Sequence, residues 1–354
     1  MKKTTIRDVA NQAKVSISTV SKFLNETHYV SEEKKNRIRE AIKKLDYEPN
    51  HIARSLVKQK TNYLGLLVPT ISNQFYPNLV EAIEKEASNK GYYLILANTS
   101  ASSEKEIELA RSLGNSRVEG LIFSSVTNSD SDSLNQLLKE GYNFVMTSRH
   151  VEEVKADFAI IDGFDGAEKA TKHLINLGHK NIGYIGGSQI IYQYKVRYKG
   201  FQYTLAVNGI QENLSCVSFN TPTVQGGYDS LLNIIRSGEI TALFVANDTM
   251  AIGVLEACRE LNIKVPEQLA IVSFDNIDFS RLGETPLTTL DSRIPELAKI
   301  SVQMLVDQLE GKPRFPPRQE ILKPNLIIRK SCGALLQRNK RNNLKNINRG
   351  ENND

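Results

Sequence analysis

The sequence predicts a small all-α headpiece followed by a larger α/β body with two lobes. Three observations predict this fold class. Residues 4–25 hold two short helical periods of apolar residues joined by a tight turn. From Tyr63 on, short apolar runs alternate with longer segments of helical periodicity, which is typical of parallel, doubly wound sheets. These strand-like runs are too many for one small sheet, so we expect two sheets in tandem, divided near Asp162.

The first two helices form a candidate helix-turn-helix. Thr5 can cap the first helix, with Asp8 in the capping-box position, and Ser16 can cap the second. The outer face of the second helix carries mainly small polar and cationic side chains, namely Ile17, Ser18, Thr19, Ser21 and Lys22. A third amphipathic helix follows Ser31. Tandem amphipathic helices also occur in ordinary bundles, so this pattern alone leaves DNA binding and a purely structural role equally open.

Charge is distributed unevenly along the chain. Residues 1–60 carry 14 Lys and Arg against 7 Asp and Glu, while the whole chain has a formal charge of only +5. A basic head on a mildly acidic body is typical of a protein that binds a polyanion at one end. The alternative for the lysines of the third helix is that they only keep an exposed face solvated.

Composition and motifs exclude several classes of protein. The chain has 354 residues, of which 40% are hydrophobic and 24% charged, and no apolar run approaches a membrane span. Its three scattered cysteines predict no disulfide framework and no metal site. We find no secretory signal, so we expect a cytoplasmic protein. Nucleotide-binding, hydrolase and zinc-protease motifs are absent, which argues against an enzyme and against a cofactor.

The body is expected to place its functional groups where strands end. Helical segments are predicted at 77–90, 104–116, 131–140, 166–177, 196–208, 226–237, 250–261 and 295–310. In open α/β sheets, ligands bind beyond the carboxyl ends of the strands, and polar and aromatic residues follow these runs. Asp248 is expected to be a structural cap of the 250–261 helix rather than a ligand contact. Beyond residue 333 the chain is Asn-rich and basic, and we expect it to be disordered.

Several short motifs then occur together in one order and spacing. They read DVA, VSISTVSK, FLN, VS, YEPN and ARSL between residues 8 and 56. With this combination the chain resembles the LacI/GalR family of bacterial transcription regulators. The resemblance implies a body like that of periplasmic sugar-binding proteins, a homodimer, and a repressor that binds operator DNA. It also implies four regions: a headpiece at 1–47, a hinge helix and linker at 48–61, an effector-binding and dimerisation body at 62–332, and a tail at 333–354.

The resemblance assigns DNA contacts by position. Ile17, Ser18 and Lys22 are expected to read bases in the major groove, and Leu56 of the hinge helix to open the minor groove. The remaining expected contacts to DNA are Thr5, Ser16, Thr19, Ser21, Asn25, Tyr29, Ser31, Asn50, Ala53 and Arg54. Two positions where the family carries glycine are occupied by Lys14 and Asp46. Both can be accommodated if those turns are not strictly left-handed, and Asp tolerates the left-handed conformation better than Lys.

For the effector, the resemblance implies a sugar-like ligand gripped by polar groups and stacked on aromatic rings. The expected contacts are Asn73, Phe75, Tyr76, Ser124, Ser125, Ser148, Arg149, Asp162, Arg197, Asn247, Asp275 and Arg293. Arg293 stands where relatives carry glutamine, so three arginines could line one cleft. Arginine pairs with carboxylate and phosphate, and we therefore hypothesise an anionic sugar derivative. The alternative is that Arg293 pairs locally with Asp291 or Glu296.

Two other functions remain open at this stage. The chain could bind DNA under the control of a protein co-regulator, such as a phosphocarrier protein. It could also be a solute-binding receptor without a regulatory role, although that reading leaves the basic head unexplained.

Overall fold

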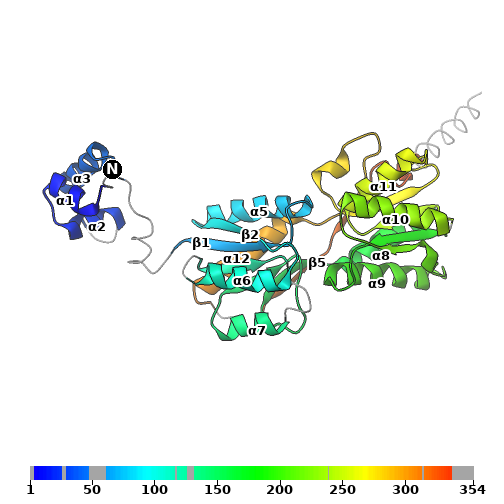
Figure 1. Cartoon of the computed structure of the whole chain (residues 1–354), viewed down its shortest axis with the longest axis horizontal. Coiled ribbons are helices and arrows are strands. Elements are labelled where there is room, and N and C mark those ends of the chain that lie inside the picture. The colour runs from blue at the N-terminus through cyan, green and yellow to red at the C-terminus, as the bar shows by residue number, and fades with distance from the viewer. Residues whose placement is uncertain are drawn as a thin grey trace, which may run out of the picture. The chain divides into compact units, whose positions relative to one another are not determined.

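The computed structural model describes residues 4–25, 29–47, 61–115, 118–125, 131–237, 239–312 and 315–336. The chain divides into two compact units, residues 1–61 and 62–354, which are described separately. Figure 1 shows the three-helix unit and the α/β unit. No helix of the described ranges is long and apolar enough to cross a membrane.

The first unit packs three helices around a small core. They are α1 (Ile6–Ala13), α2 (Ile17–Asn25) and α3 (Glu32–Lys44). The predicted capping box is present, because Thr5 and Asp8 exchange side-chain-to-backbone hydrogen bonds. The Ser16 hydroxyl accepts from the Thr19 backbone N–H at 3.1 Å and so caps α2. Ser31 stands at the N-cap of α3, but its side chain makes no capping bond. The core consists of Val9, Ala10, Ala13, Val20, Ile38, Ala41 and Tyr47.

Our expectation about the two turns without glycine was wrong. Lys14 ends α1 with φ 51° and ψ 48°, which is left-handed, and Asp46 has φ 44°. The chain compensates at the first turn through Arg37 of α3. Its guanidinium donates to the carbonyls of Ala13 (3.0 Å) and Lys14 (2.6 Å), which satisfies backbone acceptors that the end of a helix leaves without partners.

The second unit contains two six-stranded sheets, as the strand–helix alternation predicts. The first sheet has the order β11-β5-β4-β3-β1-β2, and the second has β12-β10-β9-β8-β6-β7. The strands of the first are β1 (Tyr63–Val68), β2 (Tyr93–Asn98), β3 (Gly120–Phe123), β4 (Phe144–Thr147), β5 (Asp157–Ile161) and β11 (Gln319–Leu322). Those of the second are β6 (Ile182–Gly186), β7 (Val217–Phe219), β8 (Ala242–Val245), β9 (Ala270–Asp275), β10 (Thr288–Asp291) and β12 (Asn325–Ile327). Among the strands of the described ranges, β12 alone runs antiparallel to its neighbour.

Helices cover the sheets on both faces, which explains why the strands read as continuous apolar runs. The helices of the first lobe are α5 (Phe75–Asn89), α6 (Ser103–Gly114), α7 (Ser131–Lys139) and α12 (Ile294–Leu309). Those of the second are α8 (Gly163–Asn176), α9 (Tyr192–Val207), α10 (Val224–Ser237) and α11 (Asp248–Glu260). Short 3₁₀ turns lie at Leu214–Cys216 and Asp278–Arg281. Along β1, Leu64, Leu66 and Val68 face one cluster of buried residues and Leu67 faces the other.

The chain passes between the lobes more than once. It crosses from β5 to β6 near Asp162, returns to the first lobe for α12 and β11, and then enters the second lobe again at β12 (Figure 1). Each lobe is therefore discontinuous in sequence. The three cysteines are buried and unbridged, and burial raises the pKa of Cys258 to about 12, which leaves its thiol unreactive.

Candidate functional site: a polar cavity between the lobes and an exposed recognition helix

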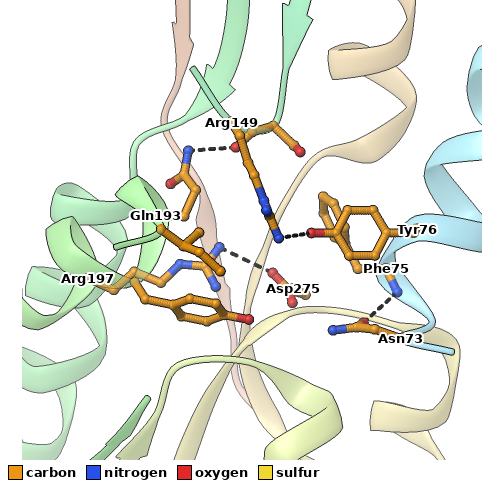
Figure 2. Close-up of a pocket in the computed structure, with 10 residues that line it drawn as sticks. Asn73, Phe75, Tyr76, Arg149, Gln193, Arg197 and Asp275 are labelled. Atoms are coloured by element: carbon orange, nitrogen blue, oxygen red, sulfur yellow. Dashed lines mark hydrogen bonds and ion pairs between the residues drawn. The ribbon is translucent and has the colours of Figure 1, made fainter. Parts of the chain in front are cut away.

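The loops that follow the strands of the two lobes meet at one polar cavity (Figure 2). Its lining residues are Asn73, Phe75, Tyr76, Ser148, Arg149, Ile191, Gln193, Tyr194, Arg197 and Asp275. The cavity offers about 40 Å³ to the centres of water molecules, and one water needs about 10–15 Å³ by that measure, so about three waters fit. It is therefore contracted around its own side chains.

Two hydrogen bonds cross the cavity from lobe to lobe. The Gln193 amide of α9 donates to the Ser148 carbonyl at 2.7 Å. The Thr249 hydroxyl of α11 donates to the Asn73 side-chain oxygen at 3.2 Å, and the same oxygen accepts from the Phe75 backbone N–H at 3.0 Å. A ligand that entered the cavity would compete with these contacts or join them.

Arg197 and Asp275 form the buried ion pair of the site. The Arg197 guanidinium donates to a carboxylate oxygen of Asp275 at 3.3 Å and also to the Ala246 carbonyl, and it lies 3.6 Å from the centre of the Phe274 ring. Burial raises the pKa of Asp275 to about 6, although Arg197 and the Ser292 hydroxyl act in the opposite direction. Its neighbour Asp248 has its pKa raised to about 7 by burial, with a contribution from Asp275.

The backbone of the site is held in unusual conformations. Asp275 has φ 113° and Ser148 has φ 57°, both in the region that residues with side chains rarely adopt. Strain of this kind costs about 1–3 kcal/mol per residue and persists where the surroundings impose it, often at ligand sites. Here the two strained residues line the same cavity.

Several predicted effector residues do not line the cavity. Asp162 accepts from the Asp165 backbone N–H and caps α8, and Asn247 accepts from the Met250 backbone N–H at 2.7 Å and caps α11. A strand-end Asp or Asn that begins a helix is used as a cap. We had expected Asp248 to be that cap, and this was wrong. It is the first residue of α11 and accepts from the Ser273 and Thr289 hydroxyls and the Ile277 N–H.

Ser124, Ser125 and Arg293, three further predicted effector contacts, are also absent from the cavity lining. The Ser124 hydroxyl bonds the Ser148 hydroxyl at 2.7 Å, and the Ser125 hydroxyl donates to Glu106, so both are committed behind the cavity. Arg293 donates to the Lys323 carbonyl at 3.2 Å and pairs with Glu296. The proposed cluster of three arginines is therefore wrong, and the local pairing that we kept as an alternative is what the structure contains.

Three cavity residues were not predicted: Ile191, Gln193 and Tyr194. The helix predicted at 196–208 begins earlier, because α9 starts at Tyr192. A polar and aromatic YQY segment directly before the predicted helix was the available signal. The apolar periodicity that we used to place helix starts is weak in this segment, because α9 carries polar residues on its buried side.

In the headpiece, the outer face of α2 is exposed as predicted. Ile17, Ser18 and Lys22 are exposed beside the buried Val20. The Ser16 hydroxyl bonds those of Ser18 and Thr19, each at 2.8 Å. Thr5 and Tyr29 are also exposed, while Ser21 and Ser31 are half-buried. Asn50, Ala53, Arg54 and Leu56, together with the side chain of Asn25, lie outside the described residues.

Comparison with known proteins agrees with this architecture. Residues 5–50 match the family model "Bacterial regulatory proteins, lacI family", and residues 171–332 match "Periplasmic binding protein-like domain". The chain is 32% identical to the HTH-type transcriptional regulator DegA of Bacillus subtilis over 94% of this chain and 99% of that protein. It is 33% identical to the ribose operon repressor of Halalkalibacterium halodurans over 93% of this chain and 97% of that protein.

Among solved structures, the lac repressor dimer bound to operator and the anti-inducer ONPF has the same fold. The TM-score is 0.86 at 24% identity, over 94% of this chain and 99% of that one. The full-length relatives above 30% identity and the headpiece match together decide the classification. The chain belongs to the LacI family of bacterial regulatory proteins and is a DNA-binding transcriptional regulator with a ligand-binding body.

Proposed function

We propose that this protein is a cytoplasmic repressor that acts as a homodimer and binds an operator through α2. A small carbohydrate-type effector in the cavity between the lobes would control its affinity for DNA. The proposal keeps the division into a headpiece (1–47), a hinge and linker (48–61), a body (62–332) and a tail (333–354).

The exposed face of α2 carries the DNA-binding part of this proposal. Ile17 is 43% exposed at the start of α2, although Val20 on the same helix is fully buried. The core does not use this large apolar side chain, and it stands beside serine hydroxyls and the Lys22 ammonium. A methyl-bearing group next to hydrogen-bond donors suits the major groove, where thymine methyls and guanine acceptors lie side by side.

The residues of this face would divide their work. Ile17, Ser18 and Lys22 read base edges, while Thr5, Ser16, Thr19, Ser21, Asn25, Tyr29 and Ser31 hold phosphates and fix the register. The proposed contacts of Leu56, Asn50, Ala53 and Arg54 with the minor groove and backbone rest on the family resemblance alone.

The effector part of the proposal rests on the composition of the cavity. Phe75, Tyr76 and Tyr194 offer ring faces, and Gln193, Arg197 and Asp275 offer donors and acceptors. Rings with convergent hydrogen-bonding groups suit a polyhydroxylated ring compound, and a relative of this chain is a ribose operon repressor. Binding would change the separation of the lobes and, through the hinge, the geometry of the paired headpieces, which couples the two sites.

Selection of DNA by the full chain tests the proposal. A random duplex library should yield one enriched, roughly palindromic sequence, and Lys22→Ala should weaken its binding and relax the base preference at one position in each half-site. The matched control is Lys43→Ala, which removes an exposed lysine of α3 and should leave the base preference unchanged. No enriched sequence, or equal effects of the two variants, would contradict the assignment of α2 as the reading helix.

A further inference from the structure

We propose that the effector carries a carboxylate or a phosphate and that Arg149 binds this group. This inference rests on the proposed function and deepens it, because it names the chemical class of the effector. Arg149 follows β4 and is only 6% exposed, and its guanidinium extends into the cavity toward Tyr76 (Figure 2).

First, the Arg149 guanidinium forms hydrogen bonds to neutral groups. One nitrogen of its guanidinium donates to the Tyr76 hydroxyl at 2.7 Å, and another donates to the Ser125 carbonyl at 3.1 Å. The group also lies 5.8 Å from the centre of the Tyr76 ring. All of these partners are neutral. A buried cation held by neutral groups alone is costly, and buried charges are ordinarily paired.

The second step is the charge balance of the cavity. Its charged lining residues are Arg149, Arg197 and Asp275. Asp275 pairs with Arg197, and no ion pair among the described residues includes Arg149. The lining therefore holds one more cation than anions. An incoming anion would restore the balance at Arg149.

Two other buried carboxyls lie near the site, and both are committed to other partners. Asp248 accepts from Ser273, Thr289 and the Ile277 backbone N–H in the second lobe. Glu106 accepts from the Ser125 hydroxyl. Neither is within ion-pair distance of the Arg149 guanidinium among the described contacts.

The third step concerns the rest of the ligand. Gln193 Oε1 and Arg197 Nε are buried atoms of the cavity residues, and neither has a hydrogen-bond partner. They supply one free acceptor and one free donor, which a ligand hydroxyl can satisfy together, because a hydroxyl both donates and accepts. The effector that fits these groups is a hydroxylated compound with an acidic group at one end.

A bound anion would displace the present hydrogen-bond partners of Arg149. The cavity has room for only about three waters, and the Arg149 side chain spans from its own strand end to Tyr76. An acid group would replace the Tyr76 hydroxyl and the Ser125 carbonyl as partners of the guanidinium, and the lobes would separate to admit the ring. Two parallel charge-assisted bonds to a carboxylate or phosphate are stronger than the two neutral contacts that they replace.

Titration calorimetry of the full chain tests this proposal. The probes are each aldopentose and aldohexose together with its aldonic acid, its uronic acid and its terminal phosphate ester. We expect at least one acid or ester to bind about tenfold or more tightly than its neutral parent. The uronic and aldonic acids then report a carboxylate ligand, and the esters report a phosphate ligand.

Three variants assign the effect to Arg149. Arg149→Gln should reduce the affinity for the acid or ester to that of the neutral parent. Arg149→Lys keeps a positive charge and should retain part of the preference. This second variant keeps the proposal testable if Arg149→Gln fails to fold. Arg293→Gln is the matched control, because it removes an arginine outside the cavity and should change nothing.

Three results would overturn the proposal. These are tighter or equal binding of a neutral parent, no binding of any acid or ester at about 1 mM, the upper end of usual substrate levels, or an unchanged preference in Arg149→Gln. The DNA selection described above uses the same protein. An enriched operator together with a failed anion screen would reject only this inference, whereas no enriched operator would reject the proposed function itself.

Discussion

Replacing Asp275 by alanine should destabilise the body strongly, because the buried Arg197 guanidinium would lose its anionic partner. Arg197 and Asp275 are 7% and 6% exposed and face each other at 3.3 Å. Removing one partner of a buried pair costs about 3–5 kcal/mol. Arg197 would keep the Ala246 carbonyl and the Phe274 ring, so we expect about 3 kcal/mol. At about 2 °C per kcal/mol for a body of this size, the melting temperature should fall by about 6 °C.

The assay is thermal unfolding followed by far-ultraviolet circular dichroism, because the chain has no tryptophan to report by fluorescence. The double variant Arg197→Met, Asp275→Ala contains no unpaired buried charge at this position. Its melting temperature should therefore be higher than that of Asp275→Ala alone. Asp278→Ala is the control, since its pair with Arg281 is exposed and contributes less than about 1 kcal/mol. Strictly additive losses in the double variant would refute the reasoning.

Three further predictions concern the turn, the helix packing and the pH dependence. Lys14→Gly relieves a left-handed residue and should stabilise the headpiece by about 0.5–1 kcal/mol, seen as a two- to fivefold slower amide exchange in α1 and α2; unchanged exchange would mean that the turn is unstrained. Gly253→Ala would place a Cβ 1.8 Å from the Val224 carbonyl oxygen and should lower the stability of the second lobe by about 1–3 kcal/mol in thermal melts, whereas a wild-type melt would disprove the close approach of α10 and α11. Burial raises the pKa of Asp248 to about 7, so the folded state binds more protons than the unfolded state between about pH 4 and 7, and the contribution of this residue to stability falls as the pH rises through that range. The midpoint of urea unfolding should therefore decline less steeply with pH in Asp248→Asn than in the wild type. An unchanged pH dependence of the midpoint would contradict the raised pKa of Asp248.

Local patterns were sufficient to predict the helices, the sheets and the outer face of α2. The capping box at Thr5 and the alternation of strands and helices depend on neighbours in sequence, which a sequence displays directly. A strand as short as β12 lacks such a local signal. β12 has three residues, and its place in the sheet is decided by its pairing with β10 rather than by its own composition.

The cavity could be predicted only in part, because a polar residue at the end of a strand has two uses. Asn73, Arg149 and Asp275 line the cavity, whereas Asp162 and Asn247 cap helices. Composition does not separate these cases, since both use the same side-chain oxygens. The choice depends on whether the next helix begins directly at that residue, and the predicted start of α9 at 196 lies four residues after its actual start at Tyr192.

Arg293 illustrates a second limit. Its identity suggested a ligand contact, but its left-handed backbone and its pairing with Glu296 place it outside the cavity. Long side chains have several polar partners within reach, and the folded surroundings select among them. The excess of positive charge is found instead at Arg149, which was one of the three arginines expected to line the cleft.

The measurement that most directly tests the central claim is the affinity of the full chain for its selected operator, with and without saturating effector. We predict a change of about fivefold or more, the usual size of coupling between two sites, and that Arg149→Gln needs about tenfold more effector to reach the same change. An operator affinity that does not respond to an effector bound in the cavity would contradict the account, because the body would then bind its ligand without controlling the headpiece.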